Sequence, residues 1–360
     1  MKHQFFFCSS LLLWNKIQNK RRMPWKGEKD PYKIWISEII LQQTRVQQGL
    51  DYYNNFIQQF PDIKSLAVAE EEKVYKLWEG LGYYSRCRNL IETARDIHNN
   101  LNGIFPDKYE EVLSLKGIGG YTASAIMSFA FNKPYAVLDG NVYRVLSRFF
   151  GIELPINSSE GKKYYATLSQ LLLDKKQPAL YNQAIMDFGA VVCKPVLPLC
   201  NICPLQKKCI AFLENKTTSL PVNNKIIKQK ERFFNYFIVR HKQDFYVAKR
   251  SGKDIWQNLY EFILIESESV FDQKDLITNP NFLSLFEGRS FKIKSESKVM
   301  SQKLTHQLIR GKFFYIEIKK PLLSQHKYIE VNESKIGELP FPKFILSYLP
   351  DKNVSLNLIS

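Results

Sequence analysis

The alternation of apolar and polar positions changes character once along the chain. Up to about Lys216, apolar residues recur at helical spacing, whereas after residue 230 they form short runs separated by polar turns. The pattern predicts an all-α region over residues 1–216 and a smaller α+β domain over residues 231–360. Residues 217–230 are polar, basic and weakly patterned, which predicts a linker. Residues 266–300 stay unassigned.

Several segments begin or end at recognisable signals. Asp30 followed by Pro31 predicts a capped helix that starts with the apolar run "YKIWISEIILQQT". Residues 105–115 predict another capped helix, residues 121–131 a third, and residues 138–150 a fourth that starts at Asp139. Further on, residues 232–250 predict two strands around a polar turn, and residues 259–266 and 312–320 predict two more.

The first residues, "MKHQFFFCSSLLLW", are apolar enough to resemble a short signal peptide. They run into "NKIQNKRRMPW" without a small-residue cleavage site, so we expect a buried first helix instead. No apolar stretch is long enough to span a bilayer. We expect a cytoplasmic protein.

The charge balance narrows the class of partner. Lys and Arg number 51 against 35 acidic residues, which gives a formal net charge of +16. Such an excess favours a polyanionic partner, above all nucleic acid. The alternative is a basic surface without a specific partner.

Four of the six cysteines lie within seventeen residues, spaced C-x6-C-x2-C-x5-C. The other two, Cys8 and Cys87, have no neighbouring cysteine, so a metal site in a reducing compartment is favoured over a disulfide framework. Zinc is compatible with the C-x2-C pair, although zinc sites usually hold two short pairs far apart. A compact group of four thiolates also suits a [4Fe–4S] cluster. An electron carrier of the ferredoxin kind would not need a basic helical body of this length. The four residues are Cys193, Cys200, Cys203 and Cys209.

A glycine turn joins two predicted helices in "LSLKGIGGYTASAI", residues 113–126. Gly117 and Gly119 permit a tight turn with exposed backbone N–H groups, and the following helix start adds positive potential for a phosphate. A plain interhelical turn would have the same sequence.

Two carboxyl groups in different surroundings are candidates for acid–base chemistry, in which one group donates a proton and the other supplies a stabilising charge. Glu38 has apolar neighbours one turn before it, and we expect desolvation to raise its pKa and keep a proton available. Asp139 lies at a helix start, where N–H groups favour the ionised form. A surface glutamate and an ordinary N-cap are the alternatives, although capping and catalysis are compatible.

Together these stretches resemble MutY-type adenine DNA glycosylases of the endonuclease III helix-hairpin-helix superfamily. The resemblance covers nearly the whole chain, including "MPW", "LWEGLGYYSRCRNL", "LDGNVYRVLSR", "NQAIMDFGAVVC" and the cysteine loop. It implies a nucleoid-associated monomer that hydrolyses adenine from adenine:8-oxoguanine or adenine:guanine mispairs in double-stranded DNA. It also implies a six-helix hairpin lobe over about 26–135, a cluster lobe from 1–25 plus 136–216, and one [4Fe–4S] cluster.

The resemblance assigns roles to individual residues. Glu38 would protonate the flipped adenine, and Asp139 would stabilise the positive sugar, electrostatically or through a transient covalent bond. Tyr121 and Asn141 would line the site. The residues implied to contact DNA are Gln43 and Tyr83 in the base stack, Gly117 and Gly119 in the hairpin, and Lys194, Lys207 and Lys208 on the cysteine loop. A surface amide and a core aromatic residue are the alternatives for Gln43 and Tyr83.

One position separates two reaction classes within the superfamily. Endonuclease III-type enzymes carry a nucleophilic lysine just after the hairpin, where this chain has Tyr121. A phenol cannot form an imine, so we expect a monofunctional glycosylase. Two alternatives are a bifunctional lyase acting on oxidised pyrimidines and a damage-binding protein without activity.

The C-terminal domain resembles the Nudix fold of MutT without its chemistry. Residues 231–360 contain no G-x5-E-x7-R-E-x-x-E-E-x-G stretch, so a pyrophosphatase is not expected. In the family this domain senses 8-oxoguanine through a Phe-Ser-His-like motif, which here reads Leu304-Thr305-His306. Thr305 keeps the hydroxyl, but Leu304 lacks the aromatic ring. A core strand is the alternative for this triplet.

Overall fold

The computed structural model describes residues 2–44, 46–224, 229–323 and 327–349. Contacts divide the chain into two compact units. The first, which we call the helical unit, comprises Met1–Val68 and Asn89–Lys225. The second, the sheet unit, comprises Ala69–Arg88 and Ile226–Ser360. The segment 69–88 therefore groups with the sheet unit, although it lies within the region that the sequence pattern predicts to be helical.

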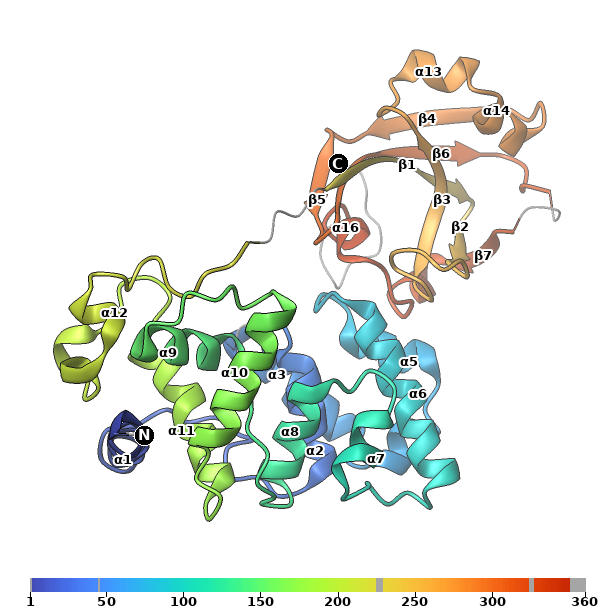
Figure 1. The fold of residues 1–360 in the computed structure, drawn as a ribbon. Coiled ribbons are helices and arrows are strands. Elements are labelled where there is room, and N and C mark those ends of the chain that lie inside the picture. The colour runs from blue at the N-terminus through green and yellow to red at the C-terminus, as the bar shows by residue number, and fades with distance from the viewer. Residues whose placement is uncertain (1, 45, 225–228, 324–326, 350–360) are drawn as a thin grey trace. The chain divides into compact units, whose positions relative to one another are not determined.

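The helical unit consists of helices and short connections (Figure 1). Its α-helices before the cysteines are α1 (Lys2–Ile17), α2 (Pro31–Leu41), α3 (Val46–Gln59), α4 (Ile63–Ala67), most of α6 (Tyr84–Asn100), α7 (Tyr109–Ser114), α8 (Gly120–Phe129), α9 (Gly140–Phe150), α10 (Ser159–Leu172) and α11 (Pro178–Val191). The 3₁₀ turns η1 (Cys200–Ile202) and η2 (Gln206–Lys208) and the helix α12 (Ile210–Leu213) follow.

Two of these helices begin as predicted and position the site. Asp30 accepts a hydrogen bond from the Tyr32 N–H and Pro31 follows it, so α2 starts at the predicted cap. Helix α2 is apolar on nearly all sides and its residues from Ile34 to Ile40 are buried, which makes it a central helix of the unit. Asp139 caps α9 in the same way.

One face of the first helix is buried, so the prediction of a buried helix is confirmed for that face only. Phe7, Leu11 and Trp14 of α1 lie in one apolar core with residues of α9 and α11. The Trp14 ring meets the ring of Phe188 on α11 edge-on, with centroids 5.0 Å apart. Among the described residues, no helix is long and apolar enough to cross a membrane.

The sheet unit is built on a mixed sheet (Figure 1). Its strands are β1 (Lys230–His241), β2 (Asp244–Lys249), β3 (Tyr260–Ser267), β4 (Phe291–Glu296), β5 (Met300–Lys303), β6 (Gln307–Ile318) and β7 (Ile329–Asn332). Their order is β4-β6-β1-β3-β2-β7, with β5 also paired to β6; β1 and β6 are parallel and the other pairs antiparallel. The helices of the unit are α5 (Glu71–Trp78), the start of α6, α13 (Gln273–Thr278), α14 (Pro280–Phe286), α15 (Glu333–Ile336) and α16 (Lys343–Leu346).

The period of two along the strands gives the sheet two apolar faces. Phe237 on β1 packs against Phe282 of α14, with ring centroids 4.8 Å apart. The preceding residue, Tyr236, faces Phe344 of α16 on the other side. Helices therefore cover both faces, and the predicted strands over 232–250, 259–266 and 312–320 are confirmed.

Three sequence expectations need correction or completion. The helix predicted over 105–115 is shorter, Tyr109–Ser114, and has no side-chain cap, because its N-cap residue is Lys108, whose side chain has no acceptor atom. The unassigned residues 266–300 contain α13, α14 and β4, which are too short to show a clear period. Part of the predicted linker, residues 225–228, lies outside the described residues. Its earlier part is not free, since the Leu220 side chain is buried in the helical unit.

Candidate active site

The helical unit contains a cavity of about 700 Å³. Its walls come from the loop before α2, from α2 and the turn after it, and from the starts of α8, α9 and α11. The predicted site residues that line it are Glu38, Gln43, Tyr121, Asp139 and Asn141. The fold thus brings together residues that lie as much as a hundred positions apart in the sequence.

Glu38 is buried in the wall of this cavity and is not a surface residue. Its side chain comes from the apolar helix α2, and the residue is 7% exposed. Burial raises the pKa of Glu38 from 4.5 to about 7, the charge of Asp139 adds to the effect, and a hydrogen bond shared with Tyr121 opposes it. The carboxyl group therefore holds a proton near neutral pH, as a proton donor must.

Asp139 is both the cap of α9 and a wall of the cavity. One carboxylate oxygen accepts from the Val142 N–H at 2.7 Å, and the other accepts from Asn141 Nδ2 at 2.7 Å. The sequence led us to expect that the helix start favours the ionised form. Burial outweighs these hydrogen bonds and raises the pKa of Asp139, but the N–H donors still stabilise its charge. Glu38 lacks such a setting on its apolar helix, so the two carboxyl groups differ in the way that acid–base pairs require.

Tyr121 begins α8 and shares its hydroxyl with Glu38. Burial, followed by the charges of Glu38 and Asp139, raises the pKa of the Tyr121 phenol well above its usual range. The phenol is therefore neutral at physiological pH. Its hydroxyl can orient the Glu38 carboxyl group without adding charge to the cavity.

Sequence reasoning missed Arg144, which connects the cavity to the cysteine loop. Its Nη2 donates to Asn141 Oδ1 at 2.8 Å and to the Gly189 carbonyl at 2.7 Å, while its Nε donates to the Cys193 carbonyl at 2.7 Å. A hydrogen-bonded chain therefore runs from Asp139 through Asn141 and Arg144 to the first cysteine. An arginine one turn after Asn141 was the only local signal.

A second missed group lies at the cavity wall around Asp187 of α11. Asp187 is 0% exposed and accepts from Arg21 Nη1 at 2.8 Å, Lys26 Nζ at 2.9 Å and Asn19 Nδ2 at 2.8 Å. Arg21 and Lys26 line the cavity, so the buried carboxylate fixes two cations there. The partners are far apart in the sequence, and no local spacing signals the pairing.

The predicted hairpin connects α7 and α8. Gly117 has a φ of +79°, and a Cβ there would lie 2.7 Å from the Asn89 Cβ, so glycine is required on two counts. Gly119 is the N-cap residue of α8 and is exposed, which leaves the backbone at this helix start open to a phosphate.

The four predicted cysteine ligands line one small cavity beside Arg148. None of them is in a disulfide, and Arg148 Nη1 lies 3.5 Å from Cys193 Sγ while donating to the Lys194 carbonyl at 2.7 Å. Four thiol donors around one space, with a cation nearby, fit a centre held by thiolates. Within the described ranges, no group of three or more His, Cys, Asp or Glu residues is arranged for a single metal ion.

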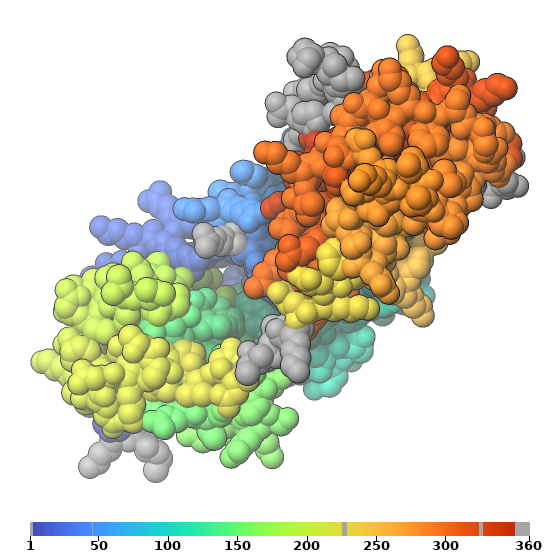
Figure 2. Space-filling model, turned by 90° about the horizontal axis from the view of Figure 1, so that it is seen from above, coloured from blue at the N-terminus to red at the C-terminus, as the bar shows by residue number. Residues whose placement is uncertain are grey.

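The surface of the cysteine loop carries the predicted lysines. The stretch from about residue 190 to residue 215, yellow-green in Figure 2, lies at the surface of the molecule. Lys207 and Lys208 are exposed in η2. The Lys208 ammonium group lies 4.3 Å from the centre of the Phe6 ring, which holds part of its side chain against α1.

The two residues predicted to enter the base stack share an unusual backbone. Gln43 has a backbone φ of 60° and Tyr83 a backbone φ of 51°. Both lie in the left-handed region, which residues other than glycine rarely adopt. Tyr83 is 44% exposed, so it is not a core residue, and Gln43 is exposed at the cavity. Tyr83 belongs to the sheet unit, so the structure does not bring these two residues into one unit.

The triplet 304–306 forms the turn between β5 and β6 and is not a core strand. Thr305 and His306 are exposed. The Thr305 hydroxyl lies 3.3 Å from the hydroxyl of Tyr83, within the sheet unit. The turn therefore brings together the predicted lesion-reading residue and one of the two predicted stack residues.

Comparisons with known proteins show which families this chain resembles. Residues 36–166 match the model of the HhH-GPD superfamily base excision DNA repair proteins. The adenine DNA glycosylase of Buchnera aphidicola from Acyrthosiphon pisum is 38% identical over 261 residues, which are 72% of this chain and 74% of that protein. The adenine DNA glycosylase of Mus musculus is 42% identical over 57% of this chain and 42% of its own length.

Solved structures give the same fold for the helical part. A thermostable thymine-DNA glycosylase is 29% identical with a TM-score of 0.55, over 59% of this chain and 98% of its own. A non-covalent endonuclease III–DNA complex is 21% identical with a TM-score of 0.52, over 60% of this chain and 98% of its own. At this identity the second likeness concerns the fold alone.

Proposed function

The chain belongs to the adenine DNA glycosylase family, and we propose that it removes adenine mispaired with 8-oxoguanine, or with guanine, from double-stranded DNA by hydrolysis. The observation that carries the proposal is the cavity that holds Glu38 and Asp139 in different surroundings. It is a base-excision repair enzyme that cleaves an N-glycosidic bond. We also propose that it acts as a monomer and has no lyase activity.

The two carboxyl groups divide the work of bond cleavage. Glu38 gives its proton to the departing adenine, which becomes a better leaving group. Asp139 remains charged, held by the Val142 and Asn141 N–H groups, and stabilises the positive sugar. Tyr121 orients Glu38, and Asn141 orients Asp139.

We propose that the enzyme is monofunctional. The residue in the cavity at the usual place of the lysine nucleophile is Tyr121, and a neutral phenol cannot form an imine with the sugar. Lys26 also lines the cavity, but its ammonium group is paired with the buried Asp187 at 2.9 Å. An amine that is engaged in an ion pair with a buried carboxylate is not free to attack the sugar.

We propose that the four clustered cysteines hold one [4Fe–4S] cluster. Their spacing and their shared cavity support this assignment. Cys193, Cys200, Cys203 and Cys209 would hold the cluster, which would order the loop so that Lys207 and Lys208 could meet DNA phosphates. Purified protein should contain four irons and four acid-labile sulfides per chain, within about ten per cent. Stoichiometric zinc without iron, from cells supplied with both, would contradict the assignment.

We further propose that the sheet unit, of Nudix-like fold, reads the base opposite adenine through Thr305 and His306. Support comes from the exposed position of both residues at a turn, and from the 3.3 Å contact of the Thr305 and Tyr83 hydroxyls. A hydroxyl can distinguish 8-oxoguanine from guanine by bonding to the oxidised edge of the base.

One assay tests the proposal. Full-length protein in excess is incubated with duplexes that carry adenine:8-oxoguanine, adenine:guanine or an oxidised pyrimidine, and each sample is split with and without hot alkali. We expect adenine release from the first two duplexes, fastest opposite 8-oxoguanine, with strand breaks only after alkali. Breaks without alkali at an oxidised pyrimidine would indicate an endonuclease III-type lyase. Binding without any base release would indicate a damage-binding protein.

A further inference from the structure

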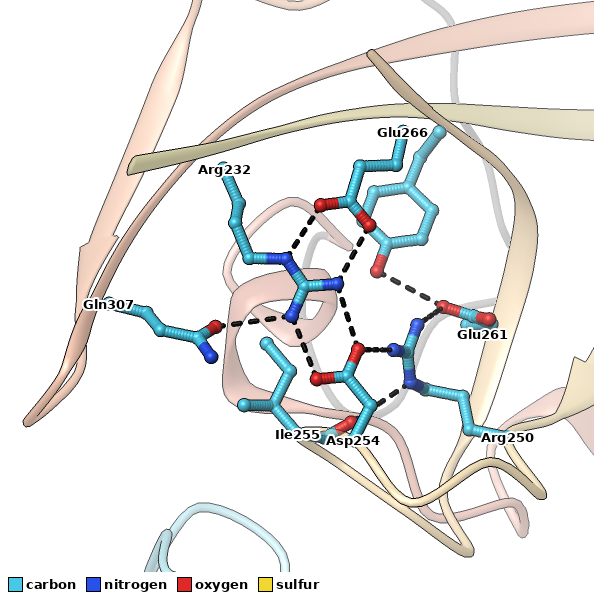
Figure 3. Close-up of polar contacts among 8 residues, drawn as sticks. Arg232, Arg250, Asp254, Ile255, Glu261, Glu266 and Gln307 are labelled. Atoms are coloured by element: carbon cyan, nitrogen blue, oxygen red, sulfur yellow. Dashed lines mark hydrogen bonds and ion pairs between the residues drawn. The ribbon is translucent and has the colours of Figure 1, made fainter. Parts of the chain in front are cut away.

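Arg232, near the start of β1, is shared among three side chains from three parts of the sheet unit (Figure 3). Its guanidinium pairs in two-pronged fashion with Glu266 on β3, at 2.6 and 2.7 Å, and with Asp254, at 2.8 and 2.8 Å. Nη1 also donates to Gln307 Oε1 at 3.2 Å. The Arg232 side chain is only 12% exposed, whereas those of Asp254 and Glu266 are 36% and 42% exposed. The two-pronged pairing on both sides of the planar guanidinium nevertheless fixes its direction.

One end of this network reaches the turn 304–306. Gln307 directly follows the turn, and its carbonyl accepts from the Leu304 N–H at 2.8 Å. Two residues shortly before Arg232 in the sequence also bind this turn. Gln229 Nε2 donates to the Leu304 carbonyl at 2.7 Å, and the Lys230 N–H donates to the His306 carbonyl at 3.0 Å. The backbone on either side of Thr305 is therefore tied to residues 229–232.

The other end reaches the segment that carries Tyr83. Asp254 lies in the connection between β2 and β3 and is also paired with Arg250, which in turn pairs with the buried Glu261. The same connection contacts the segment 69–88 through two later residues: Asn258 Nδ2 donates to the Tyr75 hydroxyl at 3.2 Å, and Gln257 Oε1 accepts from Arg88 Nη1 at 2.7 Å.

From this connectivity we infer that Arg232 is a positioning residue for lesion recognition: it fixes the turn that carries Thr305 relative to the connection that holds the Tyr83 segment, and so sets the contact between the two hydroxyls. The inference rests on the proposed role of Thr305 in reading 8-oxoguanine. Arg232 itself does not touch the lesion. Gln307 is the link through which the charged network reaches the turn.

Gln307 allows the inference to be tested without disturbing the ion pairs. Gln307→Leu removes the acceptor of Arg232 but leaves Asp254 and Glu266 paired, so the sheet unit should stay folded. Gln307→Glu keeps an acceptor for the guanidinium and serves as the conservative rescue. Arg310→Ala is the matched control, because Arg310 lies on the same strand and pairs with Glu231 at 3.0 Å, but its side chain is 45% exposed.

The readout is the ratio of single-turnover excision rates on adenine:8-oxoguanine and adenine:guanine duplexes, with thermal melting as a check of folding. Gln307→Leu should lower the ratio by up to about tenfold, the value of the one neutral hydrogen bond that Thr305 can make to the lesion, and should leave the adenine:guanine rate unchanged. Gln307→Glu and Arg310→Ala should keep the wild-type ratio. A general loss of stability would slow both duplexes together, whereas a positioning role changes only their ratio.

Thr305→Ala separates the two ways in which the inference can fail. If Thr305→Ala lowers the ratio and a folded Gln307→Leu does not, Arg232 does not position the turn and the inference is wrong, while the proposed function stands. If Thr305→Ala leaves the ratio unchanged, Thr305 does not read the lesion. The proposed role of Thr305 and the inference about Arg232 are then both wrong. If Gln307→Leu unfolds the sheet unit, Arg232→Lys replaces it, since lysine keeps the charge but cannot bond three partners in one plane; an unchanged ratio in that variant overturns the inference.

Discussion

Replacing Glu38 by glutamine should remove activity and at the same time stabilise the protein. Glutamine keeps the shape of the side chain and can still accept from the Tyr121 hydroxyl, but it has no proton of suitable acidity to give to adenine. We expect base release to fall below detection while binding to the mispaired duplex is retained.

The magnitude of the stability gain follows from the pKa of Glu38. This pKa is 4.5 in the unfolded chain and about 7 in the folded protein. Between these values the folded protein binds a proton that the unfolded chain has lost, so the free energy of unfolding decreases as the pH rises through this window. Each pH unit between the two pKa values corresponds to about 1.4 kcal/mol, so the ionised Glu38 costs roughly 3 kcal/mol above neutral pH.

Urea unfolding at two pH values tests this reasoning. Glu38→Gln should raise the free energy of unfolding of the helical unit by up to roughly 3 kcal/mol at about pH 8, and by much less at about pH 5. Glu28 lines the same cavity, and Glu28→Gln is a control for which we expect the opposite change in the free energy of unfolding. Its backbone hydrogen bonds lower the pKa of Glu28, so its charge stabilises the fold above that pKa, and the substitution should destabilise at about pH 8.

Wild-type kinetics provide the matching measurement. Since the protonated form of Glu38 is lost above about pH 7, the single-turnover rate should decrease about tenfold for each further pH unit. A flat rate between about pH 6 and about pH 9, together with an unchanged stability of Glu38→Gln at both pH values, would refute the assignment of Glu38 as a buried proton donor.

Three further predictions concern other parts of the site. Asp139→Asn should lower the single-turnover rate at least about a hundredfold without weakening duplex binding, because a neutral amide cannot offset the positive sugar; a wild-type rate would remove Asp139 from the chemistry. Replacing Lys207 and Lys208 by alanine should reduce the slope of log binding constant against log salt by up to about two, and an unchanged slope would mean that the cysteine loop does not meet phosphates. Borohydride should not trap a covalent adduct with DNA, since Tyr121 occupies the place of the lysine; efficient trapping would point to another lysine.

The sequence was sufficient where a local pattern decides the structure. The apolar neighbours of Glu38 predicted its burial, because a helix that is apolar on nearly all sides has no exposed face on which to place it. Asp139 and Asp30 were predictable as caps, since capping depends on residues within one turn. The strands over 232–250 were also predictable, because two short apolar runs around a polar turn are a local pattern.

The remaining features depend on partners that are distant in the sequence. Asp187 binds Arg21 and Lys26 across more than 150 positions, and neither end carries a signal of the other. The raised pKa of Asp139 was not predicted, because its hydrogen bonds as a cap come from neighbouring residues, whereas its burial is produced by the whole cavity. Helices as short as α13 and α14 contain too few turns for a period to emerge.

The segment 69–88 has a consequence for how this protein could be shortened or recombined. Its contacts with the rest of the sheet unit include the Glu79 carboxylate, which accepts from the Phe341 N–H at 3.0 Å, and Lys76 Nζ, which donates to the Leu339 carbonyl at 3.2 Å. Cutting the chain at residues 217–230 would leave these groups, and the buried Tyr75, without their covering strands and loops. The C-terminal part is therefore not a detachable cassette. A chimera that takes this part from a relative would have to take the matching residues 69–88 with it.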